Sequence, residues 1–470
     1  MPNHTLSRTL FFVCSLATLI ACSTTGKVVD SQQLTVTGNG RYLASGSGAD
    51  KPFFWLGDTG WLLFSRLTRE EVETYLENRK QKGFNVIQVM VLHTLSVTNM
   101  YGDSALIHKN VATPAVTAGS SFSNAAEYDF WDHVDFVVDK AAEKGIYMAL
   151  VPVWGGNVKN GGVDQQQAAT YASFLAERYK NRPNIIWLNG GDIKGSDSMA
   201  VWKTIGRTIN QLDSTHLITF HPRGRTSSSE WFHTEDWLDF NMAQSGHRTY
   251  AQDTSANEKW HYGEDNWRYI QADLARTPAK PTIDAEPSYE GIPHGLHDTT
   301  LPRWTADEVR RYGYWSVLAG AFGYTYGHNS VMQMYKKGDT KTSFGPIETW
   351  DRAIDAPGAG QMIHLKNLML AHSFFDRIPD QSMIADQGSR YEYLVASRGA
   401  GYALVYTYTG RTFKLHMGKI PGSSVAASWF NPRDGKSTVI GDVANTGVTE
   451  FNPPAEPEAG NDWVLVLQQK

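Results

Sequence analysis

Two acidic residues, Asp192 and Glu286, stand where apolar runs end and could work together as a catalytic pair. Asp192 follows the run 185–188 after an Asn-Gly-Gly segment, whose glycines permit a sharp turn and leave space for a ligand. Glu286 ends the run 281–286, where a buried strand does not tolerate an acid without a reason. Glycosidic bonds are cleaved by one carboxylic acid that protonates the leaving oxygen and one carboxylate at the anomeric carbon.

Two other interpretations of these residues stay open. Glu286 could form a structural ion pair with Arg223 while Asp192 caps a loop. Metal-dependent hydrolysis would need clustered ligands, and no His-Glu-x-x-His spacing occurs, although four histidines could still converge in space. These are His93, His221, His247 and His328. We therefore expect no metal and no cofactor.

The elements that must position this pair alternate along the chain. Short apolar runs between about residues 50 and 330 alternate with amphipathic stretches, which predicts a parallel sheet covered by helices. Eight such repeats fit a closed (β/α)8 barrel of the TIM type better than an open sheet, and no nucleotide-binding glycine motif follows the first run. The predicted strands are 53–57, 86–92, 146–153, 185–188, 217–221, 238–242, 281–286 and 321–326.

Functional side chains of such a barrel project from the C-terminal strand ends and the loops after them. In this sequence those positions are unusually polar and aromatic, although any single histidine among them could be a structural group. The predicted substrate-binding residues are Asp58, Trp61, His93, Trp154, Asn189, His221, Arg223, His247, Tyr289, Tyr324 and His328.

The sequence changes character after Arg377. Four short strand-like runs, at 391–397, 402–408, 425–430 and 463–467, are separated by turn residues. They predict a small all-β sandwich over 378–470, after a catalytic barrel over 31–377. Few loop aromatics occur in this region, which favours a structural role over polysaccharide binding.

The N-terminus has the pattern of an export signal. Arg8 precedes an apolar run, 10–21, that is too short to span a bilayer. The sequence Leu-Ile-Ala-Cys at 19–22 resembles a bacterial lipoprotein box. This predicts a signal peptide at 1–21, a lipidated Cys22 and a tether at 22–30; a plain secretory signal is the alternative. The protein is thus expected at the bacterial cell envelope, in the periplasm or on the cell surface.

Composition narrows the class of partner. The net charge of −5 without a basic block argues against nucleic acid. The chain contains 15 Trp, 21 Tyr and 20 Phe, and flat rings of this kind suit the C–H faces of sugars. The only cysteines, Cys14 and Cys22, lie in the export segment, so no disulfide is expected in the mature chain. We expect a monomer that acts on an oligosaccharide or polysaccharide and meets the membrane only through its lipid anchor.

Several motifs resemble the apiosidase-like glycoside hydrolases of family 140. They are Phe-Trp-Leu-Gly-Asp-Thr-Gly-Trp at 54–61, Asn-Gly-Gly-Asp at 189–192, Asp-Ala-Glu-Pro-Ser-Tyr-Glu at 284–290 and the ending at 462–467. The resemblance implies a retaining mechanism with Asp192 as general acid/base and Glu286 as nucleophile. It also implies that Asp58, Trp61, His93, His221 and His247 line the sugar subsite.

The same resemblance implies an exo-acting enzyme on plant cell-wall oligosaccharides, pectic and rhamnogalacturonan-II-like, that releases apiose without a cofactor. Two alternatives remain. The same machinery could act on another pentofuranoside or a uronic-acid-linked sugar, or the chain could be a non-catalytic surface lipoprotein that binds carbohydrate.

Overall fold

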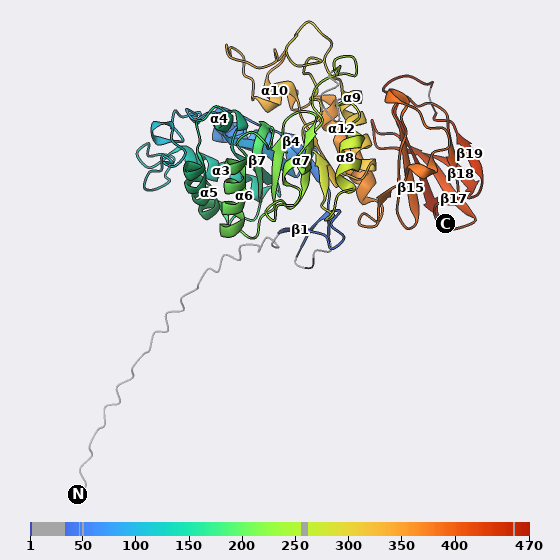
Figure 1. The fold of residues 1–470 in the computed structure, drawn as a ribbon, viewed down its shortest axis with the longest axis horizontal. Helices are drawn as coiled ribbons and strands as arrows, with labels where there is room; N and C mark the ends of the chain where they lie inside the picture. The colour runs from blue at the N-terminus through green and yellow to red at the C-terminus, as the bar shows by residue number, and fades with distance from the viewer. Residues whose placement is uncertain (2–32, 47, 49–50, 255–261, 455) are drawn as a thin grey trace.

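The computed structural model describes residues 1, 33–46, 48, 51–254, 262–454 and 456–470. A barrel with surrounding helices makes up most of the molecule, and a β-domain, orange to red in Figure 1, packs against one side of it. The predicted signal peptide, Cys22 and the tether lie outside the described residues. Within the described part of the chain, no helix is long and apolar enough to cross a membrane.

The barrel is a nearly closed sheet with the strand order β8-β7-β6-β5-β4-β12-β11-β10-β9. Neighbouring strands from β8 round to β10 are parallel, the short β9 pairs antiparallel with β10, and β8 lies against β10 to complete the ring. All eight predicted strands are present. Their bounds are β4 Trp55–Thr59, β5 Val86–Leu92, β6 Tyr147–Val153, β7 Ile185–Ile193, β8 Ile218–Pro222, β10 Asn241–Gln244, β11 Thr282–Asp284 and β12 Gly323–Tyr326, with β9 at Thr226–Ser227.

Helices cover the outside of the barrel, as the alternating pattern predicts. The longer ones are α2 Arg69–Gln81, α3 Phe130–Glu143, α5 Gln165–Tyr179, α6 Met199–Leu212, α8 Asn266–Leu274, α9 Ala306–Leu318 and α12 Pro357–Leu370. Short helices lie in the connections: α1 Leu63–Arg66, α4 Gly155–Lys159, α7 Ser229–Phe232, α10 Asn329–Met332 and α11 Trp350–Ala353. The (β/α)8 fold class is confirmed.

Local sequence explains where the helices begin. α2 begins with a capping box: the hydroxyl of Thr68 accepts from the backbone N–H of Glu71, whose carboxylate accepts from the backbone N–H of Thr68. The same reciprocal pattern starts α3 at Asp129 and α5 at Asp164. Each box satisfies backbone donors that the first helical turn leaves without partners.

A small antiparallel sheet precedes the barrel and lies below it in Figure 1. Its strands are β1 Leu34–Val36, β2 Leu43–Ser45 and β3 Lys51–Phe53, in that order. Buried side chains from this sheet, including Leu34 and Leu43, join the barrel core. The segment before the first barrel strand therefore covers the barrel end opposite the strand C-termini.

The C-terminal domain is antiparallel, as predicted. Its main sheet has the order β13-β14-β15-β20-β17-β18, and β16 pairs with β19. The bounds are β13 Ile378–Pro379, β14 Val395–Arg398, β15 Tyr402–Thr407, β16 Phe413–His416, β17 Ser424–Phe430, β18 Ser437–Ala444, β19 Val448–Phe451 and β20 Trp463–Gln469. The prediction of a strand from residue 391 is wrong, because Arg390–Glu392 forms a 3-10 turn and β14 begins only at Val395.

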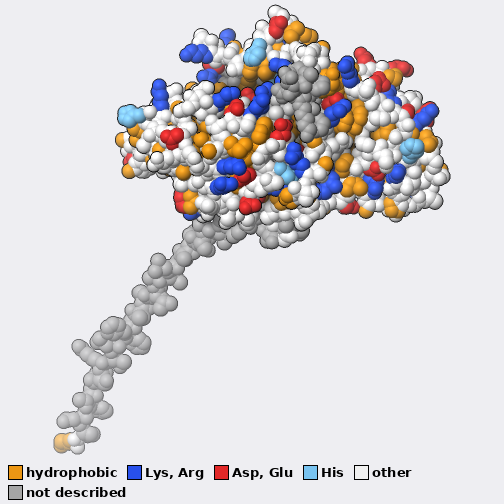
Figure 2. Space-filling view, viewed as in Figure 1, with side chains coloured by type: hydrophobic (Ala, Val, Ile, Leu, Met, Phe, Trp, Pro, Cys, Tyr) orange, Lys and Arg blue, Asp and Glu red, His pale blue; other side chains and the backbone are white. Residues whose placement is uncertain are grey.

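One face of the molecule is mixed in charge. On the face drawn in Figure 2, acidic and basic side chains are interspersed. This agrees with the absence of a basic block in the sequence.

Candidate active site

A cleft of about 840 Å³ opens at the C-terminal ends of the barrel strands. Parallel strands in a barrel all end on the same face, so residues far apart in the sequence meet there. Eight of the predicted site residues line this cleft: Trp61, His93, Trp154, Asp192, Arg223, His247, Glu286 and Tyr289.

Asp192 stands on a bulge at the end of β7. Gly190 pairs with His221 of β8 and Ile193 pairs with Pro222, so two residues loop out of the ladder between them. All three residues 190–192 have positive φ, at 91°, 104° and 47°. The two glycines are required by space as well. A Cβ on Gly190 would lie 2.6 Å from the Phe220 ring, and one on Gly191 2.5 Å from the Trp154 indole. The bulge turns the Asp192 side chain into the open cleft.

Glu286 follows β11 and is held by a set of donors. Nε2 of His221 lies 3.0 Å from its Oε2, and Nε2 of His247 hydrogen-bonds to its Oε1 at 3.3 Å. The hydroxyl of Tyr289 also hydrogen-bonds to this carboxylate. Trp61 in turn donates its indole N–H to the Tyr289 oxygen at 3.1 Å, which fixes the Tyr289 ring. The carboxylate is therefore oriented from several sides.

His221 connects the two carboxylate residues. The backbone N–H of Asp192 donates to its Nδ1 at 3.4 Å. When Nδ1 accepts this bond, the ring donates from Nε2, which faces Glu286. One buried ring thus links the bulge that carries Asp192 to the side chain of Glu286.

The two carboxyl groups have opposite pKa shifts. The Asp192 side chain is exposed at the cleft, but the cleft walls displace part of the water around its carboxyl group. This desolvation, together with the charge of Glu286, raises the pKa of Asp192 to about 6. Burial acts to raise the pKa of Glu286 as well, but hydrogen bonds from His221 and His247 overcome it and lower that pKa to about 2. Between these two values, one group holds a proton while the other is ionised.

Aromatic rings form one wall of the cleft. The Trp61 and Trp154 ring centroids are 5.4 Å apart, and both indoles pack against His221 at 5.3 and 6.0 Å. Trp61 is buried, whereas Trp154 is partly exposed and can offer its face to a ligand. Tyr289 packs edge-on against His247 at 4.6 Å on the other side.

Besides His221, four predicted substrate-binding residues do not line the cleft. Asp58 is fully buried, 3.0 Å from Nε of Arg79, and accepts from the Tyr75 hydroxyl at 2.6 Å. Asn189 donates to the Trp202 carbonyl of α6, and Tyr324 donates to the Val309 carbonyl of α9. His328 caps α10 by accepting from the N–H of Ser330.

One geometric reason explains why three of these side chains lie away from the cleft. Successive side chains of a barrel strand alternate between the barrel axis and the helices outside. The partners of Asp58, Asn189 and Tyr324 are all on helices, so these three side chains point outward. His221 is also absent from the cleft wall, but it lies directly behind it in contact with Glu286.

The cleft contains residues that the sequence interpretation did not select. Some come from the ends of β6, β7, β8 and β10 and the loops after them, and others from the segment after α10. Arg248 could have been found as the neighbour of His247, but Gln333 and Phe344 carry no local signal. The charged or polar members of this group are Lys159, Lys194, Asp197, Arg225, Gln244, Arg248, Gln333 and Ser343.

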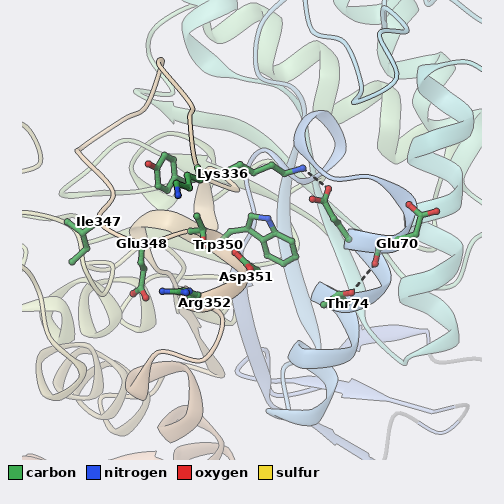
Figure 3. Close-up of a pocket in the computed structure, with 12 residues that line it drawn as sticks. Glu70, Thr74, Lys336, Ile347, Glu348, Trp350, Asp351 and Arg352 are labelled. Atoms are coloured by element: carbon green, nitrogen blue, oxygen red, sulfur yellow. Dashed lines mark hydrogen bonds and ion pairs between the residues drawn. The ribbon is translucent and has the colours of Figure 1, made fainter.

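A second cavity of about 830 Å³ lies beside α2 and α11. Figure 3 shows the side chain of Lys336 extended across this cavity. Its ammonium forms an ion pair of 2.6 Å with Glu71, which also completes the capping box of α2. Its acidic residues thus have structural partners or stand apart, with no arrangement like that of Asp192 and Glu286. In the described residues, no cluster of three or more His, Cys, Asp or Glu side chains could hold a metal ion.

Comparisons with known proteins agree with this geometry. Residues 37–376 match the family "Apiosidase-like, catalytic domain", and residues 378–468 match "Putative collagen-binding domain of a collagenase". A solved structure described as a glycoside hydrolase is 45% identical, covers 94% of this chain and 97% of its own, and superposes with a TM-score of 0.88. A structure described as a family 5 glycoside hydrolase from Bacteroides vulgatus is 44% identical, with 93% and 94% covered and the same TM-score.

A putative glycoside hydrolase from the same organism shares the fold at 14% identity, with a TM-score of 0.63 over 93% of this chain and 83% of its own. A comparison with curated proteins found no match. The family match spans most of the chain, and the two similar structures span nearly all of it. This chain is a glycoside hydrolase that belongs to the apiosidase-like family.

Proposed function

We propose that the protein is a retaining, exo-acting glycoside hydrolase in which Asp192 is the general acid/base and Glu286 the nucleophile. The observation that carries the catalytic pair is the opposite shift of the two pKa values, about 6 for Asp192 and about 2 for Glu286, within one cleft. Retention and exo action rest on the resemblance of the motifs at 189–192 and 284–290 to those of the family. An acid must hold a proton at a pH where its partner is ionised, and this pair meets that condition.

The proposed reaction proceeds in two steps. Glu286 attacks the anomeric carbon while Asp192 protonates the leaving oxygen, which gives a glycosyl ester on Glu286 and a released alcohol. Asp192, now ionised, takes a proton from a water molecule that attacks the same carbon and releases Glu286 as a carboxylate. His221, His247 and Tyr289 keep the Glu286 carboxylate oriented for attack.

We further propose that the substrate is an acidic cell-wall oligosaccharide of the pectic, rhamnogalacturonan-II-like type, with apiose as the released sugar. Five basic side chains line the cleft against three acidic ones, and two of the acidic ones are the catalytic pair. Lys159 pairs with the third, Asp197, at 3.1 Å. Such a lining favours a substrate that carries carboxylates near the cleavage point. Another pentofuranoside or a uronic-acid-linked sugar remains the alternative.

The test is to incubate the purified protein with pectic side-chain oligosaccharides and to identify the released monosaccharide and its first-formed anomer. Retention of configuration with one sugar released from the chain end is the expected result. Inversion would overturn the nucleophile role of Glu286. The Glu286→Gln variant is expected to bind the oligosaccharide without hydrolysing it. If the wild-type protein also binds without hydrolysis, the result favours the non-catalytic carbohydrate-binding alternative.

We also propose export and lipid anchoring through Cys22 at the cell envelope. The support is the sequence pattern at 1–22 alone. Cys22→Ser should move the protein from the membrane fraction to the soluble fraction of a producing bacterium. Membrane association that survives this substitution would contradict the lipid anchor.

A further inference from the structure

A buried ion pair lies where the barrel meets the β-domain. Arg311 of α9 pairs with Glu264, which precedes α8, and both side chains are almost completely excluded from water. A buried pair of this kind is retained only when further hydrogen bonds satisfy it. Glu264 has them: its Oε1 accepts from the backbone N–H of Tyr250 at 2.7 Å and from the Tyr391 hydroxyl at 3.2 Å.

The β-domain completes the surroundings of Arg311. Its guanidinium carbon lies 5.3 Å from the ring centroids of Tyr312 and Trp315, both on α9. It also lies 4.7 Å from the ring of Tyr391 and 4.8 Å from that of Tyr408, both in the C-terminal domain. The cage around this cation is therefore built half by the barrel and half by the β-domain.

The interface around this cage is packed rather than hinged. Trp267 stacks on Tyr393 with ring centroids 4.1 Å apart, and Tyr314 stacks on Tyr406 at 4.9 Å. Arg310 forms a two-pronged pair with Asp462, with contacts of 3.0 and 2.8 Å. Aromatic stacking and buried bidentate pairs hold the two domains in one relative position.

The same cage supports the segment that carries His247. This segment, 245–250, starts where Asp284 accepts from the N–H and the hydroxyl of Ser245, at 3.2 and 2.7 Å. It ends at Tyr250, whose N–H is held by Glu264 and whose ring packs on Tyr391 at 5.4 Å. His247, between these two fixed ends, donates to Glu286.

We propose that the β-domain is a positioning part of the active site, in which Tyr391 fixes Glu264 so that segment 245–250 holds His247 against Glu286. The role in catalysis rests on the proposed function of Glu286. The domain matched to a putative collagen-binding module thus orients a group of the reaction centre. Tyr391 is a positioning residue, since it acts through Glu264 and the backbone of Tyr250.

The test compares Tyr391→Phe with Tyr408→Phe. Both keep the ring against Arg311 and lose one hydroxyl bond, but the Tyr408 hydroxyl donates to Asp307 at 2.7 Å, whereas that of Tyr391 donates to Glu264. Two measurements are made on the full-length protein. They are kcat and KM on the oligosaccharide that the wild type cleaves, and amide hydrogen exchange over 245–250.

Tyr391→Phe is expected to lower kcat about tenfold with little change in KM, since a hydrogen bond to a buried charge is lost. It is also expected to speed amide exchange in 245–250, whereas Tyr408→Phe leaves both near the wild type. Equal effects in the two variants, or unchanged kcat and exchange in Tyr391→Phe, would overturn the proposal. If the wild type cleaves no glycan, the proposed function fails by itself, and exchange still decides whether Tyr391 holds the segment.

Discussion

Removal of the donor at His247 should shift the acid side of the pH–activity profile. Glu286 has a pKa of about 2 because hydrogen bonds from His221 and His247 outweigh its burial. A hydrogen bond to a charged group contributes about 1.5–3 kcal/mol, and one pKa unit corresponds to about 1.4 kcal/mol. Loss of one donor therefore raises this pKa by about 1–2 units, to about 3–4.

The sign follows from the role of Glu286 as a nucleophile that must be ionised. In the wild type, kcat/KM falls as the pH drops through about 2 and, on the other side, as the pH rises through about 6, where Asp192 loses its proton. In His247→Phe the midpoint of the acid limb moves to a higher pH, while the midpoint of the alkaline limb stays near the wild-type pH. At about pH 3 the variant then retains roughly a half to a tenth of its plateau kcat/KM.

The assay is kcat/KM from about pH 3 to about pH 8 for wild type, His247→Phe and His247→Gln. Phenylalanine keeps a ring against Tyr289, now 4.6 Å from the imidazole, but donates nothing, whereas glutamine retains an N–H donor. The glutamine variant should therefore keep the acid limb nearer to that of the wild type. An acid limb that stays fixed in His247→Phe, or an alkaline limb that moves in its place, would refute the assignment of Glu286 as the ionised group.

Three further predictions concern other parts of the site. Asp192→Asn should lower kcat about 10²–10⁴-fold on natural glycosides, and far less on aryl glycosides with good leaving groups, because only the former need protonation; equal losses on both would exclude the acid role. Gly191→Ala should lower both the thermal unfolding temperature and kcat/KM, because the new Cβ would lie 2.5 Å from Trp154 and the backbone φ is 104°. The control is Gly156→Ala, whose Cβ would have no atom within 4 Å and which should leave both quantities near the wild type. Asp58→Asn should lower the free energy of unfolding, measured with denaturant, by about 3–5 kcal/mol, because the buried pair with Arg79 is lost. A large rise in KM with unchanged stability would instead indicate that Asp58 binds the sugar.

Apolar patterning was enough to predict the barrel, because a strand buried on both faces needs a continuous apolar run and each covering helix needs an amphipathic stretch. β5 occurs with the bounds that the sequence predicts. Strand β18 was missed because nearly all of its residues are exposed at the sheet edge, so no alternation of apolar residues marks it. The short β16 and β19 were missed as well.

The sequence by itself determined the strand ends at which Asp192 and Glu286 stand, and the two glycines that release Asp192 from its strand. Only the tertiary structure decided which neighbouring side chains face the cleft. Asp58 turns toward Arg79 on α2, while His221 from β8 and His247 from the loop after β10 converge on Glu286. The physical reason is that the tilt and stagger of a closed barrel set which residue of each strand faces the axis, and these depend on all eight strands together.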